Sequence, residues 1–134
     1  MAHDRGGPPI AFQLLIYPML DDRTVLRTDI DLSGVRLWDN KCNRFGWSSY
    51  LQKPPGGAHV AAYAAPGRRL DLSGLPPAWI GVGTFDLFHD ENLQYAKRLT
   101  ECGVGCELRV VEGAYHGFDL FSPKADVVRQ FRQS

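Results

Sequence analysis

The chain has 134 residues, with 15 Lys or Arg against 15 Asp or Glu, so its formal net charge is zero. This balance excludes a nucleic-acid binder that relies on a basic surface, and the hydrophobic fraction of 44% excludes a disordered acidic tail. The length predicts one domain. No apolar run approaches the ~20 residues of a membrane-spanning helix, and the first residues lack the apolar core of a secretory signal.

The amino-terminal half contains one predicted strand. Residues 1–5 resemble the last turn of a helix, which a glycine pair then ends. The apolar run over residues 10–17 is short and lacks polar alternation, which predicts a strand buried on both faces, as in a parallel sheet. Within the Asp-, Arg-, Gly- and Pro-rich residues that follow, we expect a helix over 38–51 and one or two helical turns over 58–65.

The carboxy-terminal half has a clearer periodicity. It predicts a second buried strand over residues 78–85, an amphipathic helix over 90–102 and a third strand over 107–111. A loop over 112–118 and a last helix over 123–131 follow. The alternation of strand and helix predicts an α/β fold with a right-handed parallel unit.

Two polar residues follow predicted strands directly. Asp86 comes after the second strand and His116 after the third. Because the carboxyl ends of neighbouring parallel strands share one edge of the sheet, we expect the two side chains to meet and form a hydrogen bond. An Asp that accepts a hydrogen bond from a His ring fixes its tautomer and stabilises the imidazolium. The alternative is a helix-capping Asp and an ordinary surface His.

The cysteines indicate the compartment. Cys42, Cys102 and Cys106 are an odd number and fit no disulfide framework, and too few ligands surround them for a metal site. Free thiols are typical of a reducing environment, so we expect a cytoplasmic protein.

Four segments carry a specific pattern: QLLIYPML at 13–20, DLSGLPPA at 71–78, GTFDLFHDE at 83–91 and GAYHGF at 113–118. Together they resemble the hormone-sensitive-lipase-like esterases, a family of α/β-hydrolases. The match is loose over residues 21–70. The resemblance implies a partial α/β-hydrolase fold, in which parallel strands have flanking helices and part of a helical cap.

The resemblance also implies roles for single residues. Asp86 would be the acid and His116 the general base of a Ser-His-Asp triad that hydrolyses a small acyl ester without metal or organic cofactor. Leu87 stands where the family usually has Pro. Asp90 and Glu91 match the acidic pair of the family, and we interpret them as helix-start residues.

The nucleophile of the family is missing. It lies in a G-x-S-x-G turn, and the family forms its oxyanion hole with a His-Gly-Gly-Gly loop. Neither motif occurs in this sequence. Ser48 comes closest, but Tyr50 replaces the second glycine and no strand precedes it. We therefore expect residues 1–134 to be the carboxy-terminal part of an α/β-hydrolase domain, with 21–70 as its cap or loop segment, and to be inactive alone.

A partial fold leaves surfaces without partners. The strand over 10–17 lacks a neighbour, and apolar side chains such as Phe12 and Trp79 would need a new cover. We expect this cover to be the missing amino-terminal half or a second copy of the chain. The alternative function is a non-catalytic α/β binding or assembly module. Four aromatic residues either line an apolar site or pack a cap helix: Trp38, Phe45, Trp47 and Tyr50.

Overall fold

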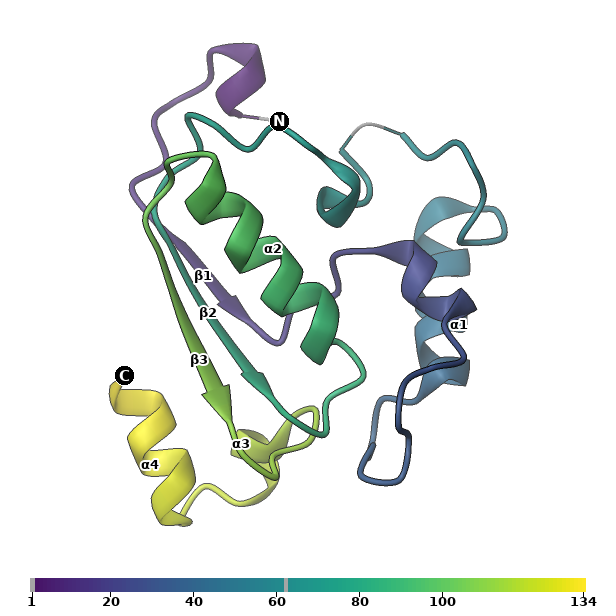
Figure 1. The fold of residues 1–134 in the computed structure, drawn as a ribbon, viewed down its shortest axis with the longest axis vertical. Coiled ribbons are helices and arrows are strands. Elements are labelled where there is room, and N and C mark those ends of the chain that lie inside the picture. Colours follow the sequence, from purple (N-terminus) through teal and green to yellow (C-terminus); the bar gives the residue numbers. More distant parts are fainter. Residues whose placement is uncertain (1, 62) are drawn as a thin grey trace.

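The computed structural model describes residues 2–61 and 63–134, and within them it contains a three-stranded parallel sheet flanked by helices (Figure 1). The strands, in spatial order, are β1 (Gln13–Ile16), β2 (Ala78–Gly83) and β3 (Cys106–Val111). The α-helices are α1 (Asn40–Leu51), α2 (His89–Glu101), α3 (Phe118–Phe121) and α4 (Asp126–Gln133). Three short 3-10 helices complete the described elements: η1 (His3–Arg5), η2 (Asp22–Leu26) and η3 (Pro66–Arg68).

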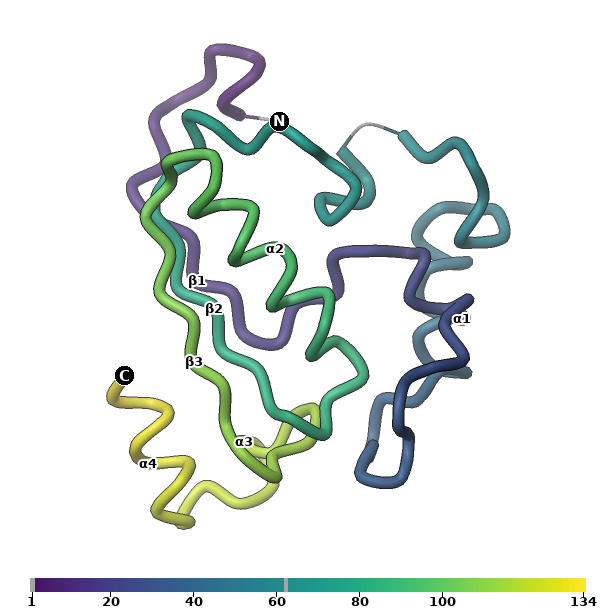
Figure 2. The backbone as a smooth tube through the Cα atoms, viewed as in Figure 1, coloured from purple at the N-terminus to yellow at the C-terminus, as the bar shows by residue number. Residues whose placement is uncertain are grey.

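The strand register confirms the predicted parallel sheet. Ala78 of β2 lies opposite Gln13 of β1 and opposite Cys106 of β3. The three strands run side by side, and the long connection from β1 to β2 makes an excursion through α1 before it returns to the sheet (Figure 2). All carboxyl ends of the strands therefore lie at one edge, where Asp86 and His116 follow.

Helix α2 covers one face of the sheet. Leu99 and Tyr95 of the helix pack with Ile80 of β2 in the largest buried cluster. The helix ends at a glycine, as predicted: Gly103 has a left-handed φ of 75°, and the backbone N–H of Val104 donates to the Leu99 carbonyl at 2.9 Å. This arrangement is a Schellman motif, which satisfies carbonyls at the helix end.

Helix α4 covers part of the opposite face. Phe131 and Val128 pack against Trp79 of β2, with the ring centroids of Trp79 and Phe131 5.3 Å apart. Trp79 is 6% exposed, so the expectation that it needs an external cover is wrong. Gly81 makes the packing possible, since a Cβ atom there would lie 2.5 Å from the Phe131 ring.

Strand β1 is less buried than predicted. The apolar run over residues 10–17 forms a strand only over its second half, and that strand is not buried on both faces. Leu14 and Ile16 are 63% and 40% exposed, and Phe12 remains exposed beside them. The reason is positional: β1 is an edge strand, and α4 contacts β3 and Trp79 of β2 on this face.

The other helices differ from the predictions in their boundaries and, in two places, in whether a helix forms. Helix α1 begins at residue 40, because the Asp39 side chain accepts a hydrogen bond from the Cys42 backbone N–H and caps it. No helix forms in 58–61 or 63–65, and residue 62 lies outside the described part, as does residue 1 of the predicted first turn. The predicted loop over 112–118 ends in the unpredicted helix α3, and the last helix begins three residues later than predicted.

Residues 21–70 contain a small core of their own. Val25 of η2, Trp47 of α1 and Ala65 are all buried against one another. This cluster stands apart from the two clusters that cover the sheet. In residues 2–61 and 63–134, no helix is long and apolar enough to cross a membrane.

Candidate active site

Asp86 occupies the turn that leaves β2. Its backbone N–H donates to the Gly83 carbonyl at 3.2 Å, and its Oδ1 atom accepts a hydrogen bond from the Phe88 backbone N–H at 2.9 Å. The side chain is fully buried. The Oδ1 bond closes a turn just before α2, but α2 has Phe88 as its N-cap and no side-chain cap bond, so Asp86 does not cap this helix.

His116 lies on the loop that leaves β3. The loop is attached to the end of β2, because the Phe85 N–H donates to the Ala114 carbonyl at 2.9 Å and the Thr84 hydroxyl accepts from the Gly113 N–H at 2.9 Å. These bonds hold the histidine loop beside the end of β2. The Nδ1 atom of His116 lies 3.0 Å from the Oδ2 atom of Asp86, so the expected hydrogen bond is present.

Aromatic rings surround the His116 imidazole. Its ring centroid lies 4.5 Å from that of Tyr17, 5.5 Å from that of Phe88 and 5.7 Å from that of Trp38. These contacts limit the orientations that the imidazole can adopt. The His116 side chain keeps 20% of its surface exposed.

The four candidate aromatic residues separate clearly. Trp38 is the one that contacts His116. Trp47 is 1% exposed and belongs to the core of the 21–70 segment. Phe45 and Tyr50 are 75% and 61% exposed on α1. Trp47 therefore packs α1, as one alternative had it, whereas Trp38 lies beside the His116 imidazole.

The arrangement of Asp86 and His116 can perform proton transfer. When Nδ1–H donates to the buried carboxylate, Nε2 is the unprotonated ring atom and can accept a proton from an attacking hydroxyl. The carboxylate then stabilises the resulting imidazolium. A general base and an orienting acid would need this hydrogen bond.

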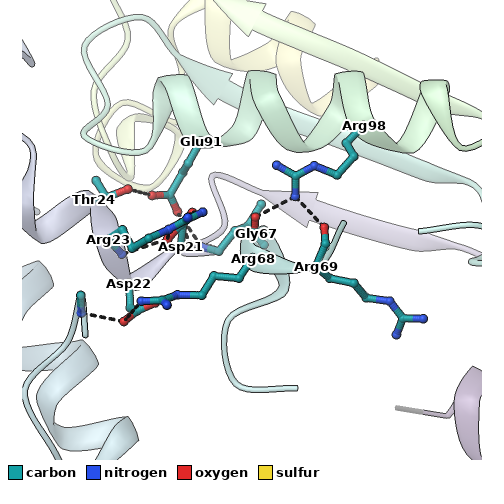
Figure 3. A network of polar contacts seen from close by, with 11 residues as sticks. Asp21, Asp22, Arg23, Thr24, Gly67, Arg68, Arg69, Glu91 and Arg98 are labelled. Atoms are coloured by element: carbon teal, nitrogen blue, oxygen red, sulfur yellow. Dashed lines mark hydrogen bonds and ion pairs between the residues drawn. The ribbon is translucent and has the colours of Figure 1, made fainter. Parts of the chain in front are cut away.

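A buried carboxyl joins the start of α2 to the segment after β1 (Figure 3). Glu91 Oε1 accepts hydrogen bonds from the backbone N–H groups of Leu20 at 2.6 Å and Asp21 at 3.2 Å, and Oε2 accepts from the Thr24 hydroxyl. Burial raises the pKa of Glu91 to about 7, although these hydrogen bonds oppose the shift. Interpreting Glu91 as a helix-start residue missed this contact, which only the fold could reveal.

Two arginines extend the same network (Figure 3). Arg68 pairs with the fully buried Asp22 at 2.6 Å, and Asp22 also accepts from the Gly56 backbone N–H. Arg98 of α2 donates to the carbonyls of Gly67 and Arg69 at 2.7 and 2.8 Å. The network therefore fixes the 21–70 segment against the helix that begins beside Asp86.

Ser48 does not have the setting of a nucleophile. It lies inside α1 rather than at a strand-to-helix turn. A cavity of about 560 Å³ is lined by Gln13, Leu75 and Pro76 at the opposite end of the sheet from Asp86 and His116. Within the described residues, no group of three His, Cys, Asp or Glu side chains could hold a metal ion.

Comparison with known proteins identifies the family. A family profile described as alpha/beta hydrolase fold matches residues 1–120. The chain belongs to this α/β-hydrolase family. The resemblance to the hormone-sensitive-lipase-like esterases and the partial α/β-hydrolase fold are both confirmed.

Individual relatives are named as esterases. The chain is 34% identical over 122 residues to esterase LipI and 35% identical over 132 residues to carboxylesterase NlhH, both of Mycobacterium tuberculosis. These alignments cover 87% and 91% of the chain but 36% and 39% of the relatives. The chain therefore spans less than half the length of these relatives.

Solved structures agree with the alignments. A bacterial heroin esterase superposes with a TM-score of 0.85 at 35% identity, covering 98% of this chain and 42% of that protein. Esterase LipW from Mycobacterium marinum superposes with a TM-score of 0.80 at 37% identity, covering 97% of this chain and 40% of that protein.

Proposed function

We propose that this chain supplies the acid and the general base of a carboxylic ester hydrolase, with Asp86 and His116 as two members of a Ser-His-Asp triad. The observation that carries the proposal is the 3.0 Å contact between His116 Nδ1 and the fully buried Asp86 carboxylate. The esterase names of the relatives support the same reaction class. The substrate would be a small acyl ester.

In this reaction a serine hydroxyl attacks the ester carbonyl while His116 Nε2 takes its proton. Asp86 holds the imidazole in the required tautomer and stabilises the imidazolium. The proton then passes to the leaving alcohol, and water hydrolyses the acyl-enzyme by the same exchange of roles. These steps need neither a metal ion nor an organic cofactor.

The nucleophile would come from residues outside these 134. The sequence contains no G-x-S-x-G turn and no His-Gly-Gly-Gly loop. We therefore propose that residues 1–134 act as the carboxy-terminal part of an α/β-hydrolase domain, with 21–70 as its cap or loop segment. Its partner would be an amino-terminal half or, failing that, a second copy. The free cysteines favour a cytoplasmic location.

The first test uses the purified chain. We expect no hydrolysis of a short-chain nitrophenyl ester above that of the His116→Ala variant, and no labelling by a serine-reactive fluorophosphonate. The physical reason is that an absent nucleophile and oxyanion hole remove orders of magnitude in rate. Turnover that His116→Ala abolishes would place a nucleophile within these 134 residues.

The second test supplies the missing part. The chain would replace the matching segment of carboxylesterase NlhH, and the hybrid would be assayed on the same ester. We expect activity that falls by about 10⁴-fold in Asp86→Asn and by about 10⁶-fold in His116→Ala. His89→Ala is the matched control, since the hydrogen bond recorded for the His89 side chain is to its neighbour Asp90. A folded, inactive hybrid would favour the non-catalytic binding module instead.

A further inference from the structure

We propose that Tyr17 is a positioning residue for His116: its ring packs against the imidazole, and its hydroxyl is anchored by Asp119 on the helix that follows the histidine loop. The inference rests on the proposed role of His116 as general base. It assigns a function to the end of β1, a strand that contributes no group to the proton transfer itself.

The backbone of Tyr17 is the first observation. Its φ of 36° lies in the left-handed region, which side chains other than glycine rarely adopt. The residue nevertheless keeps its place in the sheet, because its N–H donates to the Gly81 carbonyl at 2.7 Å. Strained residues persist where surrounding contacts over-determine them, and such residues concentrate at functional sites. For Tyr17, the contacts of the side chain with His116 and Asp119 hold the residue in this conformation.

The ring and the hydroxyl of Tyr17 act on the same loop. The ring centroid lies 4.5 Å from that of His116 with the planes inclined by 61°, the shortest of the three aromatic contacts of the imidazole. The hydroxyl donates to the Asp119 carboxylate at 2.9 Å. Burial and this hydrogen bond raise the pKa of Tyr17 to about 12, so the hydroxyl remains a donor at neutral pH.

Asp119 is itself held in place. It is 8% exposed in α3, three residues after His116, and Arg132 of α4 donates to its backbone carbonyl at 2.7 Å. The Arg132 guanidinium also lies 3.7 Å from the Asp119 carboxylate. The chain of contacts therefore runs from α4 through Asp119 to Tyr17 and ends on the imidazole.

These contacts constrain a degree of freedom that Asp86 leaves open. A hydrogen bond to Nδ1 fixes the tautomer, but the imidazole can still turn about that bond. A ring packed against the imidazole limits this rotation and thereby keeps Nε2 aimed in one direction. Tyr17 touches neither substrate nor nucleophile in this account, so its effect is on the orientation of His116.

The test measures the Nδ1–H proton of His116 in the 134-residue chain by NMR. A proton donated to a buried carboxylate gives a far-downfield resonance, and its exchange with water reports how often the pair opens. We expect Tyr17→Phe to accelerate this exchange roughly five- to tenfold, as the loss of one hydrogen bond implies. Asp119→Ala should reproduce the effect. Asp119→Asn keeps an acceptor oxygen for the tyrosine and should restore slow exchange.

Controls separate positioning from general destabilisation. Tyr50→Phe removes a hydroxyl from an exposed tyrosine of α1 and should leave the resonance unchanged. Protection of the Ile80 backbone amide at the centre of the sheet should be the same in all variants. A resonance that is present but insensitive to both Tyr17→Phe and Asp119→Ala would overturn this inference alone. Absence of the resonance from the unchanged chain would instead count against the Asp86–His116 pair and the proposed function.

Discussion

At the scale of single residues, Glu91 links the charge state of one carboxyl to the stability of the fold. Its folded-state pKa is about 7, against an ordinary value of 4.5. The unfolded chain therefore releases this proton near pH 4.5, while the folded chain retains it until about pH 7. The contribution of Glu91 to the unfolding free energy is therefore greatest below pH 4.5, where the carboxyl is protonated in both states. This contribution falls as the pH rises from 4.5 to 7, and it does not change further above pH 7.

The variant Glu91→Gln removes this titration. We expect the unfolding free energy of the unchanged chain to fall by about 3 kcal/mol relative to the variant between pH 4.5 and 7, since one pKa unit corresponds to about 1.4 kcal/mol. Urea unfolding at a series of pH values measures the difference. Glu101→Gln, on the exposed end of α2, is the matched control. Parallel pH curves for the unchanged chain and Glu91→Gln would contradict the prediction.

The residues of the site were predictable to different degrees. Asp86 and His116 could be located because each directly follows a strand, and parallel strands bring such positions together. Tyr17 ends a strand at the same edge, so its position carried the same signal. Its proposed role depends on a strained backbone and on a hydrogen bond to Asp119. The spacing of residues along the chain predicts neither of these. Glu91 could not be distinguished from Asp90 without knowing which one faces Leu20.

At the scale of elements, the pair depends on how closely the histidine loop approaches the end of β2. Gly83 permits this approach, because a Cβ atom there would collide with the Ala114 carbonyl oxygen. That carbonyl accepts the Phe85 N–H at 2.9 Å and fixes the loop. A side chain at position 83 would therefore push His116 away from Asp86.

We expect Gly83→Ala to destabilise the fold by about 1–3 kcal/mol, the usual cost of overpacking, and to weaken the Asp86–His116 hydrogen bond. Thermal unfolding and the His116 Nδ1–H resonance measure the two effects. Gly105→Ala is the matched control, since a Cβ there would meet only Pro77 at 4.0 Å. If the two variants had the same unfolding free energy, the histidine loop could move away from position 83 without destabilising the fold, which would contradict the prediction.

The sequence periodicity predicts the secondary-structure elements that are long enough to show several repeats of the pattern. Helix α2 shows several turns of apolar spacing and a glycine stop, so both its type and its end were predictable. Helix α3 has four residues, too few to display a helical period, so the sequence does not predict it. The described residues of 58–65 form no helix for a different reason: alanine content without an amphipathic face gives a helix no apolar side to pack against its neighbours.

At the scale of the whole molecule, the burial of β1 could not be read from its sequence. An uninterrupted apolar run is typical of a strand covered on both faces, but the cover must come from other elements. Here Leu15 packs partly buried against the cluster under α2 on one face of β1, and Leu14 and Ile16 stay exposed on the other. The outer edge of β1 also has no strand beside it within the described residues.

This edge gives the last prediction. Unpaired N–H and C=O groups beside exposed apolar side chains favour pairing with another chain, and a zero net charge provides no repulsion to oppose it. A two-fold pairing of the β1 edges is the simplest closed arrangement for a second copy. We expect sedimentation velocity to show concentration-dependent association that Leu14→Lys strongly reduces, because a buried ammonium at the interface is costly. Leu70→Lys is the matched control, since Leu70 is 83% exposed and lies outside the sheet. A folded species that remains monomeric at high concentration would mean that β1 tolerates solvent without a partner.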